Sequence, residues 1–187
     1  INEYLVGSSF SLQTISGSLP YDKPAAILDT LHARALVKDT EYTFEPALEP
    51  IRATSTDVEF VNAVLKIKPH DATFYGQDAG DSHLDIDFND GNAVLTAYIK
   101  TRAQASGGVL TLLEHYGIPF PFEQTSGLTD TDLILAIDLA TIDITANGKF
   151  NAENSEFAFD GHSIAASKLD ISLDTDKIRI GRLELHK

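Results

Sequence analysis

The sequence predicts a mainly β protein, built as a curved antiparallel meander that forms an open groove. Three observations indicate this fold: apolar and polar residues alternate along most of the chain, one stretch carries a hairpin signature, and a single segment has helical spacing. A closed β-sandwich is the alternative, because alternation requires only that something apolar covers the inner face of each strand. That cover is either a second sheet or a ligand lying along one curved sheet.

Alternating apolar residues mark strands in both halves of the chain. The positions between them carry Asp, Lys, Thr, Ser and Asn, as in half-buried strands. Two segments, 84–95 and 169–180, look like copies of one unit, each with a strand, a polar turn and a returning strand. The apolar residues that share a face are Leu31, Ala33, Ala35 and Val37; Leu133, Leu135, Ile137 and Leu139; Phe157 and Phe159; and Leu169, Ile171 and Leu173.

The stretch LDIDFNDGNAVLTAYIK, residues 84–100, begins like the calcium-binding loop of an EF-hand. Such a loop needs a glycine at position 6 for its sharp turn and a bidentate glutamate at position 12. Counted from Asp85, position 6 is Asp90 and position 12 is Thr96. We therefore expect calcium to bind here no better than about millimolar.

A β-hairpin accounts for the same residues. The pair Asp90-Gly91 favours a type I′ turn, in which both central residues have positive φ. One face of the hairpin then becomes wholly apolar, and a slip of one residue would turn every apolar group outward. The predicted register pairs Asn89 with Asn92, Phe88 with Ala93, Asp87 with Val94, Ile86 with Leu95, Asp85 with Thr96, and Leu84 with Ala97.

One short α-helix is predicted near residues 107–117. Ser106 is a possible N-cap and Gly117 a stop signal. The apolar stripe of this helix must bury itself against the sheet or plug an opening in it. The residues predicted to form the plug are Val109, Leu112, Leu113 and Tyr116.

Composition limits the class of protein. At 187 residues the chain is long enough for one β-rich domain, 1–187, with a sizeable core. Its net charge of −14 argues against general affinity for nucleic acid or anionic lipid headgroups. Cysteine is absent, so disulfides and thiolate sites are excluded. Methionine is absent too, even at position 1, and we expect the chain to be a fragment of a longer protein.

No motif in the sequence predicts catalysis. The six histidines are scattered without the spacing of metal ligands. Acidic pairs such as Asp85/Asp87 and Asp130/Asp132 could support glycoside hydrolysis, but they lie on the outward faces of predicted strands. Nucleophile elbows, P-loops and dinucleotide-binding glycine motifs are absent. We therefore expect no enzyme activity, no cofactor and no metal.

The second half of the chain, between Leu112 and Ile180, carries a series of short motifs. They are a short helix, the segment Gly-Ile-Pro at 117–119, Gly-Leu-Thr-Asp at 127–130 leading into a strand, Asn-Gly-Lys-Phe at 147–150, and a repeated strand beginning Leu-Asp-Ile. In these motifs the chain resembles the AsmA-like superfamily, nearest to its YhdP-like branch.

The resemblance implies a periplasmic segment of a protein that is anchored in the bacterial inner membrane. Such proteins form repeating β-groove bridges whose apolar inside carries phospholipid acyl chains toward the outer membrane, with neighbouring β-groove repeats of the full-length chain as partners. The alternative is a structural or protein-binding β-sandwich module without lipid.

The hairpin register and the resemblance together predict one concave apolar surface. Asp85, Asp87 and Asp170 should lie outside it. The predicted lipid-groove lining consists of Leu84, Ile86, Phe88, Leu95, Ile99, Leu133, Leu135, Ile137, Phe157, Phe159, Leu169, Ile171 and Leu173.

Overall fold

A computed structural model places the described strands in one open antiparallel sheet, and this confirms the predicted fold class. The structure describes residues 5–18, 22, 27–43, 48–89, 91–105, 107–115, 117, 121–175 and 177–186. Within these residues the sheet has 13 strands, and every pairing between them is antiparallel. The alternative of a closed β-sandwich is wrong, because all of these strands belong to one sheet.

The strands follow the chain as a meander, interrupted by two short helices. The helices are α1 (Ile27–Thr30) and α2 (Gly108–His115). The strands are β1 (Leu5–Val6), β2 (Ser9–Ser16), β3 (His32–Tyr42), β4 (Ile51–Val61), β5 (Val64–His70), β6 (Thr73–Phe74), β7 (Gln77–Asp78), β8 (His83–Asp87), β9 (Val94–Ala103), β10 (Glu123–Asp138), β11 (Ile144–Phe159), β12 (His162–Asp174) and β13 (Lys177–Leu185).

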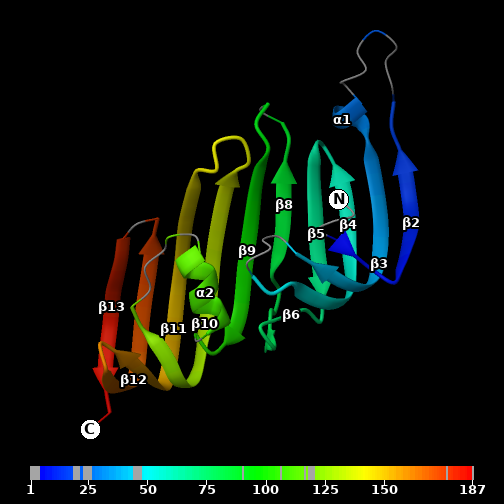
Figure 1. Ribbon diagram of the computed structural model, residues 1–187. Coiled ribbons are helices and arrows are strands. Elements are labelled where there is room, and N and C mark those ends of the chain that lie inside the picture. The colour runs from blue at the N-terminus through cyan, green and yellow to red at the C-terminus, as the bar shows by residue number, and fades with distance from the viewer. Residues whose placement is uncertain are drawn as a thin grey trace.

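The order of strands in the sheet nearly follows the order in the chain. The main path runs β1-β3-β4-β5-β8-β9-β10-β11-β12-β13, and β2 pairs with β3 on the same side as β1 (Figure 1). The short strands β6 and β7 pair with each other, and β6 also pairs with one end of β4. The long edges of the sheet are therefore β2 at one end and β13 at the other.

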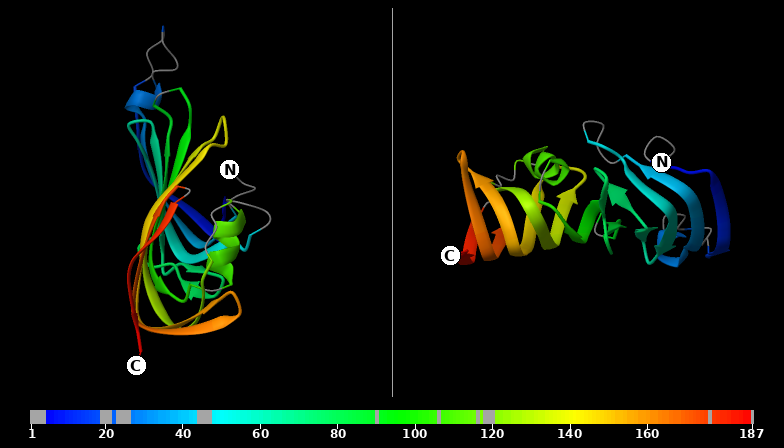
Figure 2. Two further views of the ribbon diagram at one scale, coloured as in Figure 1. Left: turned by 90° about the vertical axis from the view of Figure 1, so that its left-hand side faces the viewer. Right: turned by 90° about the horizontal axis from the view of Figure 1, so that it is seen from below.

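The sheet is curved, and α2 lies on its concave side (Figure 2). Seen along the sheet, the ends of the β10–β11 and β11–β12 hairpins bend toward the side that carries α2. The result is a trough whose long axis runs across the strands.

The predicted hairpin register is confirmed between β8 and β9. Leu84 pairs with Ala97 and Ile86 with Leu95. β8 ends at Asp87, and the N–H of Phe88 donates instead to the carbonyl of Ala63 at 2.9 Å. Gly91 has φ of 79°. Asp90 lies outside the described residues, so the type of the turn is not established. The two similar sequence units are both hairpins, β8–β9 and β12–β13.

Two details differ from the sequence prediction. Leu139 was expected to continue the strand of Leu133, but β10 ends at Asp138 because that carboxylate caps the following turn. The short helix α1 was not predicted, since its four residues are too few to show a helical period.

The main hydrophobic core lies under α2, on the concave side of β10, β11 and β12. Leu113 of the helix is 1% exposed and packs into this core. The buried core residues are Leu113, Leu133, Leu135, Ala146, Phe150, Ala152, Phe157, Ala166, Leu169, Ile171 and Leu173. The same face of β3 to β9 carries no helix, and most of its apolar residues are only half-buried.

Candidate functional site: an apolar groove on the concave face

Two rows of apolar side chains cross eight strands of the sheet without interruption. Residues paired directly across strands place their side chains on the same face. Starting at β2 and ending at β11, the first row is Ile15, Ala33, Phe60, Leu65, Ile86, Leu95, Ile137 and Ile144, and the second is Leu12, Ala35, Val58, Ile67, Leu84, Ala97, Leu135 and Ala146.

The C-terminal strands continue the apolar face with a shifted row. Leu133 of β10 stands between Ile99 of β9 and Gly148 of β11, and Gly148 pairs in turn with Leu173 of β12. Ile178 of β13 completes this row. The concave face is therefore apolar from one edge of the sheet to the other.

A cavity of about 330 Å³ opens on this face between β4 and β10. Apolar side chains of the second row, including Ile67, Leu84 and Leu135, form its floor, and Leu113 of α2 closes it on the C-terminal side. The residues that line it include the charged or titratable groups Asp78 and His83, but no described lysine or arginine. The volume falls at the low end of the roughly 300–1,000 Å³ of small-molecule sites.

The structure brings most of the predicted lining residues together on the concave face. The paired rows contain Leu84, Ile86, Leu95, Ile99, Leu133, Leu135, Ile137 and Leu173. Leu169 and Ile171 are buried in the core, where they pair with Ala152 and Phe150 of β11. Phe157 is buried in the core under α2. Phe88 and Phe159 sit at the margins: Phe88 packs against Phe60 with ring centroids 6.3 Å apart, and Phe159 stacks on Phe122 at 5.1 Å.

The predicted plug helix is present, and its described side chains fix its position. Leu113 is buried among the residues of β10 to β12. Val109 and Leu112 belong to α2, and Tyr116 lies outside the described residues. At the start of the helix, a Cβ on Gly108 would overlap the ring of Tyr75, which follows β6. The helix is thus held between the β6–β7 hairpin and the core.

Three glutamines that the sequence analysis missed anchor the segment containing α2. Gln77 accepts from the N–H of Gln104 at 2.7 Å and donates to the carbonyl of Gln104 at 3.1 Å. Gln104 donates to the carbonyl of Gln124 at 2.7 Å. Gln124 accepts from the N–H of Ala105 at 2.8 Å and from the hydroxyl of Thr129 at 2.7 Å. No sequence pattern marks these residues, because their partners are distant in the chain.

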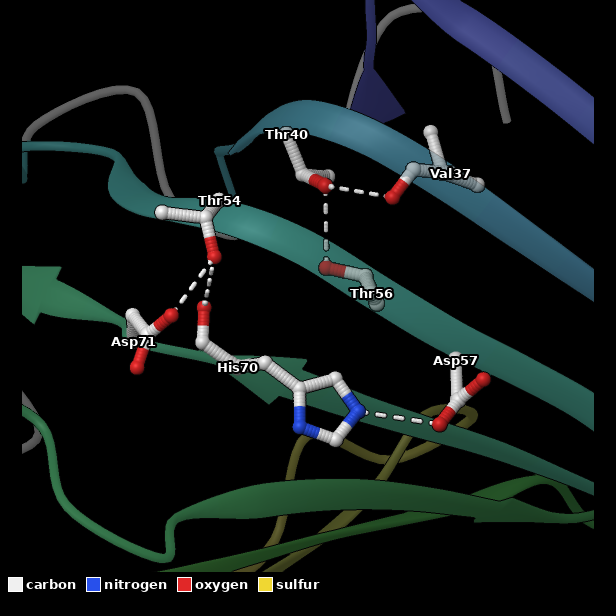
Figure 3. A network of polar contacts seen from close by, with 7 residues as sticks. All are labelled: Val37, Thr40, Thr54, Thr56, Asp57, His70 and Asp71. Carbon is white, nitrogen blue, oxygen red and sulfur yellow. Dashed lines mark hydrogen bonds and ion pairs between the residues drawn. The ribbon is translucent and has the colours of Figure 1, made fainter.

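A small polar cluster stands at the β3–β4 side of the groove (Figure 3). The hydroxyl of Thr56 donates to that of Thr40 at 3.0 Å, and Thr40 donates to the carbonyl of Val37 at 3.4 Å. Both threonines are buried and both line the cavity. On the convex face of β5 and β4, His70 Nε2 and Asp57 Oδ2 are 2.9 Å apart and do not line the cavity. The groove therefore includes neutral hydrogen-bonding groups along one side.

The convex face carries the charges. Every lysine and arginine that the structure describes lies on a strand at a position that points away from the groove, and many stand opposite carboxylates. The paired convex rows are Arg34, Glu59, Lys66 and Asp85; Lys100, Asp132, Lys149, Ser172 and Arg179; and Arg102, Asp130, Asn151, Asp170 and Arg182.

The acidic residues predicted outside the groove are on the convex face. Asp85 and Asp170 belong to the convex rows, and Asp87 shares the face of Asp85. Asp87 also accepts from the N–H and the side-chain amide of Asn89, at 2.9 and 2.7 Å. The carboxylate of Asp87 thus stabilises the backbone where the β8–β9 hairpin turns.

The described residues form neither a metal-binding cluster nor a helix that could span a membrane. No group of three or more His, Cys, Asp or Glu in this part of the chain is arranged to hold a metal ion. Neither α1 nor α2 is long and apolar enough to cross a membrane.

The chain matches no protein-family model, no curated protein and no solved structure. The groove itself is therefore the basis on which a function can be proposed.

Proposed function

We propose that the groove binds the acyl chains of phospholipids and that the protein is a lipid-carrying segment of the AsmA-like type. The observation that carries this proposal is the pair of apolar rows that cross β2 to β11 on an open sheet. A single sheet leaves this face without a second sheet, and α2 covers only the part over β10 to β12. The apolar surface that remains on the other strands calls for an apolar occupant.

The dimensions of the rows suit an acyl chain. Neighbouring strands are about 4.8 Å apart, so eight strands span about 34 Å. One leaflet of a bilayer has a hydrocarbon thickness of about 15 Å, half of the roughly 30 Å core. A chain lying across the strands therefore fits with room to move along the trough.

The energetics favour such a path. Exposing an acyl chain of about 16 carbons to water costs on the order of 10 kcal/mol, at about 0.8 kcal/mol per CH₂. Aliphatic side chains that continue from strand to strand would remove much of this cost without fixing the lipid in one place. Headgroups could remain in water at the open side.

In this proposal the full-length protein is anchored to the inner membrane and the segment works in the periplasm, moving phospholipid toward the outer membrane. The exposed edge strand β2 supports neighbouring β-groove repeats as partners. β2 carries no charged residue and all of its residues are exposed, including Phe10, Leu12 and Ile15 on the apolar side. Natural edge strands usually carry charges or proline that prevent such pairing.

Native mass spectrometry of the purified protein, incubated with phosphatidylcholine vesicles, tests the proposal. We expect bound phospholipid in the parent and its loss in Ile86→Asp, where a charge enters the half-buried floor of the groove. Thr145→Asp is the matched control, because it adds the same charge to an exposed convex position of β11. Ile86→Asp should remain folded by circular dichroism, since its carboxylate can still reach water.

A second candidate function is protein binding by strand addition at β2, which the exposed, uncharged edge favours. If the parent protein, Ile86→Asp and Thr145→Asp all lack bound phospholipid, lipid binding is contradicted. Protein binding by strand addition would then be the remaining candidate.

A further inference from the structure

The loop between β10 and β11 projects two apolar side chains at the margin of the groove. Leu139 is 42% exposed and Ile142 is 63% exposed, and both line the cavity. The end of this hairpin bends toward the concave side of the sheet (Figure 2). The loop thus extends the apolar surface beyond the strands, at a place open to the surroundings.

The backbone at Ile142 is unfavourable for its residue type. Ile142 has φ of 61°, in the left-handed region that a β-branched residue rarely adopts. Asparagine and aspartate tolerate this region better, and the chain uses such a residue at Asn62, between β4 and β5, where φ is 52°. The isoleucine at 142 therefore disfavours the backbone conformation of the loop, but it places a large apolar side chain at the surface.

Hydrogen bonds hold the loop in this conformation. One carboxylate oxygen of Asp138 accepts from the N–H groups of Ala140 at 2.8 Å and Thr141 at 3.0 Å, and these bonds lower the pKa of Asp138. The hydroxyl of Thr141 donates to Asp143 at 2.8 Å. The N–H of Leu139 donates to the carbonyl of Ala93 at 2.8 Å, which ties the loop to the neighbouring hairpin. The two apolar side chains are thus presented by a fixed turn.

We propose that this loop is the contact through which the groove takes up an acyl chain from a lipid bilayer. Leu139 and Ile142 touch the hydrocarbon at the bilayer surface and guide it onto the row that ends at Ile137 and Ile144. The proposal rests on the proposed function and adds the place of uptake to it. Asp138 and Asp143 at the base of the loop favour a bilayer without net negative charge.

Replacement of Ile142 by glycine should slow the uptake of lipid without lowering the stability of the fold. Glycine adopts positive φ freely, so Ile142→Gly should keep or raise the denaturation midpoint. The rate at which fluorescent phosphatidylcholine leaves phosphatidylcholine vesicles should fall about tenfold. This is the effect expected when an isoleucine side chain that is partly buried in the bilayer is lost. Ile142→Asn, which also tolerates this backbone, should give the same loss.

Thr175→Gly is the matched control. Thr175 is a second β-branched residue with positive φ, 49°, in the turn between β12 and β13, and it does not line the cavity. Its replacement should leave the transfer rate unchanged. Transfer at the parent rate by Ile142→Gly and Ile142→Asn would overturn the uptake proposal while lipid binding stands. A parent that neither binds nor moves lipid would overturn both proposals.

Discussion

At the scale of single residues, the groove contains polar groups that depend on each other. Thr40 and Thr56 are 4% and 2% exposed, and the hydroxyl of Thr56 has that of Thr40 as its acceptor. A buried hydroxyl without an acceptor costs more than the same site filled by an apolar group of equal shape. The stability of the groove at this point therefore depends on both hydroxyl groups being present or both being absent.

Thr40→Val should lower the free energy of unfolding by about 1–3 kcal/mol, because the hydroxyl of Thr56 then lacks its acceptor. Urea denaturation measures the change. The double variant Thr40→Val/Thr56→Val should recover most of the loss, since both polar groups are removed together. A double variant that is less stable by the sum of the single effects would contradict this coupling.

At the scale of elements, α2 lies over the core of β10 to β12, and side-chain amides hold the segments on either side of the helix. Gln124 is 1% exposed and uses both ends of its side chain: its oxygen accepts from Ala105 and Thr129, and its nitrogen donates to Ser155 at 3.1 Å. Because Ala105 precedes α2 and Gln124 follows it, this one side chain fixes both flanks of the helical segment.

Gln124→Ala should cost about 2–4 kcal/mol of stability, since it leaves several buried donors and acceptors without partners. Hydrogen exchange should also become faster across the described part of residues 105–122. Gln13→Ala is the control, because Gln13 lies exposed on β2. Unchanged exchange in Gln124→Ala would mean that the contacts of Leu113 alone hold the helix.

At the scale of the whole molecule, charge is divided between the two faces of the sheet. The described lysines and arginines point to the convex side, whereas Asp78 lines both the groove and a second pocket that includes Lys100 and Arg102. An anionic headgroup above the groove would meet this carboxylate in a protein of net charge −14. If lipid binds as proposed, the protein should prefer phosphatidylcholine to phosphatidylglycerol with the same acyl chains.

Asp78→Asn should increase the retention of phosphatidylglycerol relative to phosphatidylcholine about two- to fivefold, the effect of one exposed charge. The amide oxygen of asparagine can still accept from the N–H of Gly80, as Asp78 does at 2.7 Å. Asp170→Asn changes the net charge equally on the convex face, away from both pockets, and should have no such effect. Competition for an equimolar lipid mixture measures the ratio, and high salt should reduce the difference.

The alternation of apolar residues and the pairing of strands in a hairpin could be predicted from the amino-acid sequence. Ile86 faces Leu95 as predicted because a period of two fixes the register locally. That the strands stay in one open sheet is visible only in the folded structure, since alternation fits a second sheet equally well. The folded structure also decided that Leu133 is buried under α2 while Ile86 remains half-exposed, although the two look alike in sequence. Burial depends on what lies above a strand, and the Gln77, Gln104 and Gln124 contacts that place α2 join residues far apart in the chain.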